Sequence, residues 1–297
     1  MSAFQYGWHG QRSDPESFYV EFERCTRAPA SWKEELFTAA KHIVKRAGAR
    51  PIWLCFSGGL DSEIMCNAFF EQGIGFSILT LRHTDGTNDF DIRYAKKWCA
   101  ARGIYQHIVP VDMNAFFENE ISAYGAYATQ YPSRHLQIHL LELIEKQGGF
   151  GVIGAGKQLF TLGAKEKNGQ GPLSVLFEVG VAGPHEWSKQ HNTEHEPFFF
   201  FSTPELTLSY LSMPLIDFAI SHPDIFTHPA NTYTLKRVAY QSQWPEIEAR
   251  SKYNGFEKIL PQMRLASQRL SEHFGPTLQT FLLPVESMKK QLSIYGS

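Results

Sequence analysis

The chain has 297 residues, of which 43% are hydrophobic and 20% charged, a profile that is typical of globular proteins and excludes general disorder. The formal net charge of −2 leaves no overall basic field for a polyanion, so nucleic acid is a disfavoured partner. No stretch approaches the roughly 20 apolar residues that span a bilayer, and the N-terminus does not resemble a secretory signal, so we expect no membrane partner and a cytoplasmic protein.

The region from residue 31 to residue 156 alternates predicted helices with short apolar strands. A helix is predicted over 31–47, where Ser31 and Glu34 form a capping box. Strands are predicted at 51–56, 76–83, 105–112 and 150–156, and helical patterns between them at 61–73, 91–103, 113–127 and 133–149. This alternation predicts an α/β fold with a doubly wound, mostly parallel sheet, in which ligands bind at the carboxyl ends of the strands.

The pattern changes beyond the fourth strand. Residues 163–201 are rich in Gly, Asn, Gln, Pro and His, which predicts an insertion or an active-site lid. We expect 202–297 to be a helical C-terminal region that completes the active site. An N-terminal extension of 1–50 with one helix and a nucleotide-binding core of 51–162 complete the expected domain organisation.

The sequence SGGLDS, residues 57–62, stands between the first strand of this core and the helix that follows it. Its glycines let the main chain approach a ligand closely, and the amides of the loop and of the helix N-terminus favour an anion. Asp61 would repel a bare phosphate, so its presence indicates a Mg²⁺ ion between the carboxylate and the phosphate. The loop lacks the GxxxxGK[ST] pattern of a Walker A motif.

SGGLDS resembles the signature of the PP-loop ATP pyrophosphatases, which cleave ATP between the α- and β-phosphates. Four later segments resemble, in order along the chain, the synthetase domain of asparagine synthetases and β-lactam synthetases: NDFDIRYAKKWCAARGI, GVIGAGKQLF, LSMPLID and WPEIEARSKYNGF. The resemblance covers roughly residues 50–258. It implies a PP-loop fold, ATP and Mg²⁺ as cofactors, and AMP-forming ligase activity.

The resemblance also implies roles for individual residues. Those that would bind the pyrophosphate part of ATP are Ser57, Gly58, Gly59, Leu60, Asp61 and Ser62, with Asp61 also on Mg²⁺. Leu81 would lie near the adenine, and Gly154 and Gly156 would line the second wall of the site, where Lys157 could hold a phosphate directly. Lys252 matches the family's lysine that neutralises charge on the phosphates and on the tetrahedral intermediate.

Three features depart from the family's pattern. GAGKQLF lacks the acidic pair of the family's GxGxDELF loop, so either Mg²⁺ has fewer protein ligands or an acid such as Glu178 substitutes. Tyr210, which the resemblance implies is catalytic together with Asp61 and Lys252, stands where asparagine synthetases use a glutamate and β-lactam-forming relatives have a tyrosine, which argues against plain asparagine synthesis. Ser2 stands in place of the family's N-terminal cysteine nucleophile, so we expect nitrogen from free ammonia, an amine substrate or a separate partner.

Two further motifs leave alternatives open. HNTEH, residues 191–195, matches the zinc-binding pattern HxxEH, and the alternatives are a zinc site and a solvated lid that contacts substrate. FFFF, residues 198–201, predicts a buried strand or a lid anchor, with a wall of the substrate pocket as the alternative. Cys55 and Cys66 are expected to be buried free thiols.

The expected function follows from the loop and the resemblance together. We expect an enzyme that uses ATP to adenylate a carboxyl, carbonyl or amide oxygen of a small-molecule or peptide substrate and transfers the activated group to a nitrogen nucleophile. A PP-loop enzyme that thiolates RNA bases and a non-catalytic ATP-binding module are the alternatives.

Overall fold

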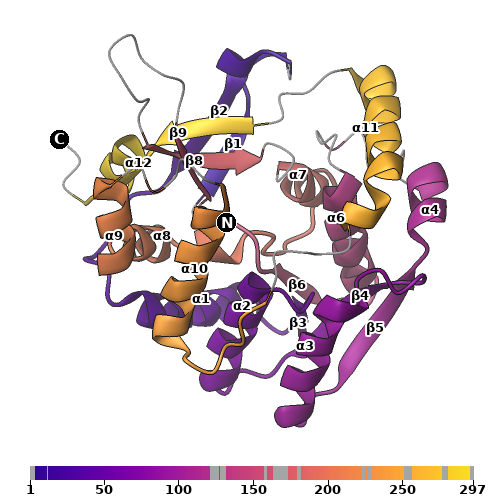
Figure 1. Ribbon diagram of the computed structural model, residues 1–297, viewed down its shortest axis with the longest axis horizontal. Helices are drawn as coiled ribbons and strands as arrows, with labels where there is room; N and C mark the ends of the chain where they lie inside the picture. The colour runs from indigo at the N-terminus through magenta and orange to yellow at the C-terminus, as the bar shows by residue number, and fades with distance from the viewer. Residues whose placement is uncertain are drawn as a thin grey trace.

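The computed structural model describes residues 4–11, 13–120, 127, 132–156, 159–162, 173–178, 182–222, 225, 229–250, 256–275 and 280–294. One layer is a parallel sheet in the strand order β5-β4-β3-β6 (Figure 1). The strands are Ile52–Cys55 (β3), Ser77–His83 (β4), Gln106–Val111 (β5) and Phe150–Ile153 (β6). The connecting helices include Leu60–Glu71 (α2), Asp89–Ala101 (α3), Met113–Ala115 (α4), the π-helix Phe116–Glu120 and Pro132–Glu145 (α6). The predicted doubly wound α/β fold is confirmed.

The order of the strands reverses beside β3. The chain runs outward from β3 through β4 to β5 and then returns to add β6 on the other side of β3, with each pair parallel. A crevice at the carboxyl ends of the strands, where their order reverses, is the usual ligand site of such sheets. The loop 57–59 follows β3 and the loop 154–156 follows β6, so both glycine loops lie at this position.

The local sequence accounts for these elements. The central strand β3 is apolar on both faces because helices cover it, and Leu54 and the following Phe56 are fully buried. The helix before it, Trp32–Ala47 (α1), has the predicted capping box: the Ser31 hydroxyl accepts from the Glu34 amide, and the Glu34 carboxylate accepts from the Ser31 amide at 3.0 Å. These short-range patterns explain why the sequence predicted most of the core elements to within a few residues; of the predicted helix 113–127, residues 121–126 lie outside the described residues.

Five further strands form two antiparallel sheets that the sequence did not predict. Phe4–Trp8 (β1) pairs with Phe18–Phe22 (β2), and a second sheet has the order β7-β8-β9. Its strands are Leu159–Leu162 (β7), Leu173–Glu178 (β8) and Thr280–Pro284 (β9). The prediction that 202–297 is helical is wrong at β9. Its partner β8 is about a hundred residues earlier in the sequence, beyond the reach of local patterns.

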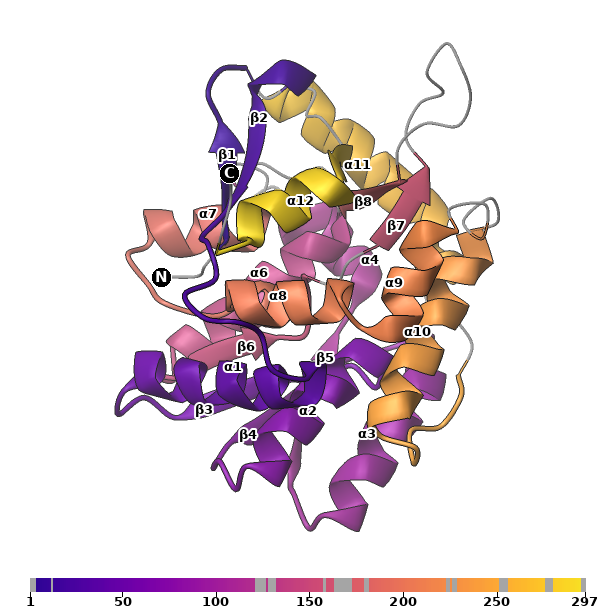
Figure 2. The ribbon, with the colours of Figure 1, turned by 90° about the vertical axis from the view of Figure 1, so that its left-hand side faces the viewer.

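The remaining helices follow β8 in the chain, and all but the last of them lie between β8 and β9. They are Ala182–Gln190 (α7), Pro204–Leu211 (α8), Pro214–Ser221 (α9), Pro229–Gln243 (α10), Leu260–Phe274 (α11) and Val285–Leu292 (α12), with short 3₁₀ turns at Pro15–Ser17, Phe199–Phe201 and Phe256–Ile259. Figure 2 shows the antiparallel sheets and α12 on one side of α8, and the parallel sheet with α1–α3 on the other. None of the helices within the described ranges is long and apolar enough to cross a membrane.

The four consecutive phenylalanines join these layers. Residues 198–201 are buried as expected, but Phe199–Phe201 form a 3₁₀ turn and not a strand. The ring of Phe201 stacks on Phe4 of β1 at 4.9 Å and on Phe177 of β8 at 5.6 Å between ring centroids. The motif therefore anchors the antiparallel sheets to the rest of the core.

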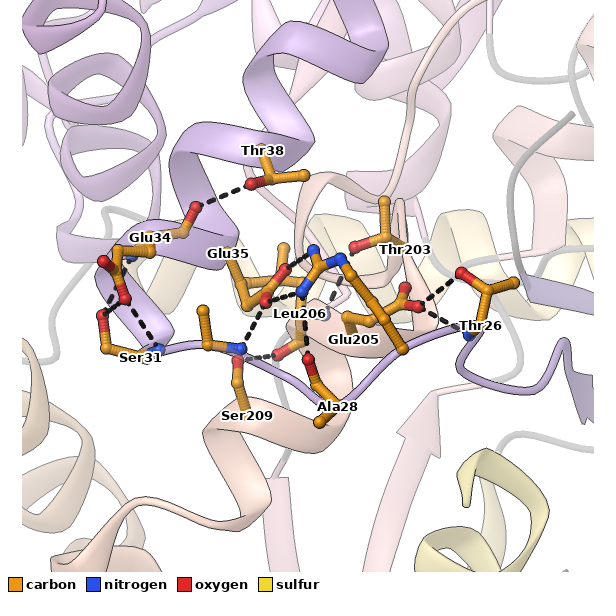
Figure 3. A network of polar contacts seen from close by, with 12 residues as sticks. Thr26, Ala28, Ser31, Glu34, Glu35, Thr38, Thr203, Glu205, Leu206 and Ser209 are labelled. Atoms are coloured by element: carbon orange, nitrogen blue, oxygen red, sulfur yellow. Dashed lines mark hydrogen bonds and ion pairs between the residues drawn. The ribbon is translucent and has the colours of Figure 1, made fainter. Parts of the chain in front are cut away.

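Buried carboxylates fix the segment between β2 and α1 to the neighbouring helices (Figure 3). The fully buried Glu35 accepts from both amino groups of Arg27, at 2.5 and 2.6 Å, and from the Ala30 amide at 2.6 Å. On α8, the Glu205 carboxylate accepts from the amide and the hydroxyl of Thr26. The segment before the parallel sheet is thereby bound to a helix that follows the sheet in the sequence. The domain boundaries expected at 50, 162 and 201 stay a prediction.

Candidate active site

The loop 57–62 turns the chain from β3 into α2. Gly58 has φ of +94°, and a Cβ atom on it would lie only 2.0 Å from the carbonyl oxygen of Asp91. Only glycine accommodates both this left-handed conformation and the close approach of α3. Gly59 is the N-cap of α2, with no side-chain cap. The positive end of the helix dipole is thus directed at the loop, as an anion site requires.

Two serine hydroxyls face each other across this turn. The Oγ atoms of Ser57 and Ser62 are 3.1 Å apart, the Gly59 amide donates to Ser57 Oγ at 3.2 Å, and Ser62 Oγ donates to the Gly59 carbonyl at 2.9 Å. Ser57 is exposed, whereas Ser62 is buried. The hydroxyls therefore line the start of α2, one of them open to solvent.

The carboxylate of Asp61 is held by two side chains of α10. Lys236 Nζ lies 3.0 Å from Asp61 Oδ2, and the Tyr240 hydroxyl donates to Asp61 Oδ1 at 2.8 Å. The Lys236 side chain is 7% exposed and that of Asp61 is 16% exposed, so this is an almost buried ion pair. A helix 175 residues further along the chain thus supplies a cation to the loop.

The sequence did not single out Lys236 and Tyr240. The signal available was their spacing: residues four apart on a helix share one face, so a lysine and a tyrosine at i and i+4 can contact the same group. Which group they contact depends on how α10 packs on α2, and no local pattern in the sequence reports that.

Tyr210, predicted to be catalytic, lies on α8 near the same carboxylate. Burial, and secondarily the charge of Asp61, raise the pKa of Tyr210 above its ordinary value. Burial and Asp61 also raise the pKa of Tyr240, which keeps its hydroxyl protonated and able to donate. The structure therefore brings Asp61 and Tyr210 together with the two residues of α10.

Arg250 fixes the loop from the other side. Its guanidinium donates to the main-chain carbonyl of Gly58 and pairs with the Glu63 carboxylate. The guanidinium carbon also lies 4.3 Å from the centre of the Tyr94 ring. Burial raises the pKa of the neighbouring Asp91 to about 6, with the charge of Arg250 opposing that rise.

The other predicted site residues have different surroundings. A Cβ atom on Gly154 would lie 3.0 Å from the Cα of Ser62, so the loop after β6 packs directly on the first turn of α2. Gly156 has φ of +83° and abuts the Phe201 ring. Leu81 is half-buried, and its carbonyl accepts from the Asn88 amide group at 3.0 Å. Lys157 and Lys252 lie outside the described residues.

One carboxylate at the loop could contribute to a Mg²⁺ site. A carboxylate has about four lone-pair positions, so its contacts with Lys236 and Tyr240 do not by themselves prevent Asp61 from ligating a metal ion. Magnesium in nucleotide sites commonly takes one or two carboxylates and completes its shell with phosphate oxygens and waters. Asp61 can therefore be the single carboxylate ligand of a Mg²⁺ ion. The ammonium of Lys236, which contacts the same carboxylate, would compete with the metal for it. The side chain of Glu178, the suggested substitute acid, lies outside the described residues.

The HxxEH string does not form the helix that a zinc site needs. Helix α7 ends at Gln190, before the string begins. His195 is buried: its Nδ1 accepts from the Gly151 amide at 3.0 Å, and its Nε2 lies 3.1 Å from Glu145. Burial, together with the charge of Arg50, lowers the pKa of His195 to about 3. His195 therefore supports β6 as a neutral side chain, and Cys55 and Cys66 are buried free thiols as predicted.

No protein-family model and no curated protein matches the chain. Among solved structures, NMN synthetase from Francisella tularensis is 12% identical over 83% of this chain and 95% of its own, with a TM-score of 0.36. NH3-dependent NAD synthetase from Campylobacter jejuni subsp. jejuni NCTC 11168 is 15% identical over 75% of this chain and 100% of its own, with a TM-score of 0.37. Likeness at this level does not assign an activity.

Proposed function

We propose that this protein is an AMP-forming ligase, similar in chemistry to asparagine synthetases, that cleaves ATP between its α- and β-phosphates. The observation that carries the proposal is the position of SGGLDS. It is the turn from β3 into α2 beside β6, where the strand order reverses and nucleotides bind in sheets of this type. An uncapped helix start, two hydroxyls and a lysine converge there.

The proposed roles follow the geometry of the loop. The residues proposed to hold the pyrophosphate part of ATP are Ser57, Gly58, Gly59, Leu60 and Ser62. Gly154 and Gly156, on the loop that packs against the start of α2, would face the α-phosphate, with Lys157 beside them. Leu81, at the end of the neighbouring strand β4, would lie under the adenine. Bound Mg²⁺ would neutralise charge on the phosphates, with Asp61 as its protein ligand.

The acceptor of the adenylyl group is proposed to be a carboxyl, carbonyl or amide oxygen of a small molecule or a peptide. Adenylation gives that oxygen a good leaving group, and the protein then needs to orient a nitrogen nucleophile and stabilise developing charge. Tyr210 and Lys252 are the residues we propose for orientation and charge stabilisation. Ammonia, an amine or a separate donor protein would supply the nitrogen.

A non-catalytic ATP-binding module is the second candidate. GAGKQLF lacks an acidic pair, and Asp61 already has a cation from the protein itself, which would suit a site that binds nucleotide without turning it over.

One experiment separates these candidates. The protein is incubated with MgATP and panels of candidate acids and amines, and the exchange of labelled pyrophosphate into ATP is followed together with the nucleotide products. We expect exchange with the correct acid and formation of AMP and pyrophosphate. ADP and phosphate as the only products would contradict the proposed function, and tight ATP binding without any exchange would favour the non-catalytic module.

A further inference from the structure

We propose that Lys236 is the phosphate-binding cation of this site: it is held by Asp61 in the free protein and changes partner, from Asp61 to a phosphate oxygen, when nucleotide binds. This inference rests on the proposed function and deepens it, because it assigns the role to a residue of α10 in addition to Lys252.

The first argument is the burial of Lys236. The residue is 5% exposed, and lysines are almost never buried to this extent without a partner. Its partner in this structure is the acidic residue of the loop itself. The rings of Tyr233 and Tyr240 lie 5.4 and 5.9 Å from Nζ, so aromatic faces also stabilise the ammonium at this position.

The second argument is the charge balance at the start of α2. Asp61 lies in the first turn of this helix, next to Ser62, whose hydroxyl lines the loop. A phosphate group bound by the loop therefore approaches the Asp61 carboxylate, and the two anions repel each other unless a cation lies between them. Lys236 is already in contact with one of the two anions, so it can offset this repulsion without rearrangement of α10.

The third argument is that Asp61 stays fixed if Lys236 moves. Tyr240 donates to the other carboxylate oxygen, so the carboxylate keeps one hydrogen bond and its orientation when the ammonium leaves. The lysine stem has four methylene groups with rotatable bonds, so its ammonium can change partner over a short distance, whereas the planar guanidinium of an arginine would be restricted. Asp61 would then be available to a Mg²⁺ ion that arrives with the nucleotide.

The test measures the binding of inorganic pyrophosphate by calorimetry, with EDTA and with Mg²⁺, at constant ionic strength. The variants are Lys236→Met, Asp61→Asn and the double variant Asp61→Asn/Lys236→Met. The control is Lys33→Met, which breaks a 2.9 Å ion pair with Glu71 at the far end of α2, about 15 Å from the loop by helix rise.

We expect Lys236→Met to weaken binding in Mg²⁺ at least about tenfold, the scale for losing one charge-assisted hydrogen bond. Asp61→Asn should tighten metal-free binding because it removes the repulsion and releases Lys236. The double variant should lose the part of that tightening that Lys236 supplies, so it should bind metal-free pyrophosphate more weakly than Asp61→Asn does. The Lys33→Met control should bind within about twofold of the wild type.

The double variant keeps the test decisive even if Lys236→Met alone fails to fold, because it removes both charges of the Asp61–Lys236 ion pair together. If the double variant binds metal-free pyrophosphate as tightly as Asp61→Asn does, Lys236 contributes nothing and the inference is overturned. If the wild type binds neither pyrophosphate nor ATP in either buffer, the proposed function itself fails. Binding by the wild type with no difference among the variants overturns the inference alone.

Discussion

The guanidinium of Arg250 donates to the main-chain carbonyl of Gly58, 192 residues earlier in the chain. The same side chain pairs with Glu63 on α2, and both residues are buried. A segment that follows α10 thereby holds the loop between β3 and α2 in one conformation. The loop is preorganised by residues from the second half of the chain.

Arg250→Met should destabilise the protein by about 3–5 kcal/mol, because it leaves the buried carboxylate of Glu63 without its cation. Arg250→Lys should recover only part of this, since an ammonium cannot reproduce the two-pronged contact. Urea unfolding of each variant measures the effect. Arg93→Met is the matched control, because Arg93 is exposed and lies 4.9 Å from the same Tyr94 ring. If Arg93→Met and Arg250→Met lower the free energy of unfolding equally, the contacts of Arg250 with Gly58 and Glu63 do not stabilise the protein more than an exposed arginine does.

Gly58→Ala and Gly59→Ala should differ sharply in stability although they are adjacent. Alanine at 58 is strained at φ of +94° and collides with the Asp91 carbonyl, so we expect a loss of at least about 1–3 kcal/mol. At 59, φ is −72° and an added Cβ meets only Ser57 Oγ at 3.4 Å, so the loss should stay near the roughly 1 kcal/mol of an N-cap change. Melting temperatures of the two variants give the comparison, and similar values would contradict the close packing of α3 on the loop.

Stability should fall with rising pH because of Asp91. The pKa of this carboxyl is raised from 3.8 to about 6 in the folded protein, chiefly by burial, so the folded state retains a proton that the unfolded state has lost. The contribution of Asp91 is therefore most favourable below about pH 4 and is lost as the pH rises through about 6. In Asp91→Asn this loss is absent. The variant's gain in free energy of unfolding over the wild type should be larger at pH 7.5 than at pH 5.0, as measured in urea, and a gain independent of pH would refute the assignment.

Lys252→Ala should lower kcat for pyrophosphate release by about 10²-fold or more, the scale for removing a positioned electrostatic donor. The affinity for ATP should change less, because the loop 57–62 makes most of the proposed ground-state phosphate contacts. Lys252→Arg should rescue only in part, since a guanidinium differs in shape and reach. Steady-state kinetics with a melting curve for each variant provide the measurement. Wild-type turnover in Lys252→Ala would show that the match to the family's lysine is accidental.

Several elements that the sequence missed share one physical cause. The strands β8 and β9 pair with each other across about a hundred residues, and each is short, so neither carries a pattern that identifies it alone. The phenylalanines 198–201 looked like a strand because they are aromatic and apolar. Their conformation is instead set by the rings of Phe4 and Phe177, which come from two other segments. The burial of these four phenylalanines was predictable from their apolar character, but their main-chain conformation depended on side chains from distant segments.

The sequence by itself determined the position of the candidate site. An apolar strand, a glycine turn and an amphipathic helix are adjacent in the chain, so local propensities were sufficient to predict the loop at the end of β3 and the parallel sheet around it. Only the tertiary structure decided what surrounds Asp61. Lys236 and Tyr240 reach it from 175 and 179 residues away because the fold brings this face of α10 within hydrogen-bonding distance of the start of α2. Contacts at that separation depend on how whole helices pack, and the residues between them in the sequence carry no local signal of it.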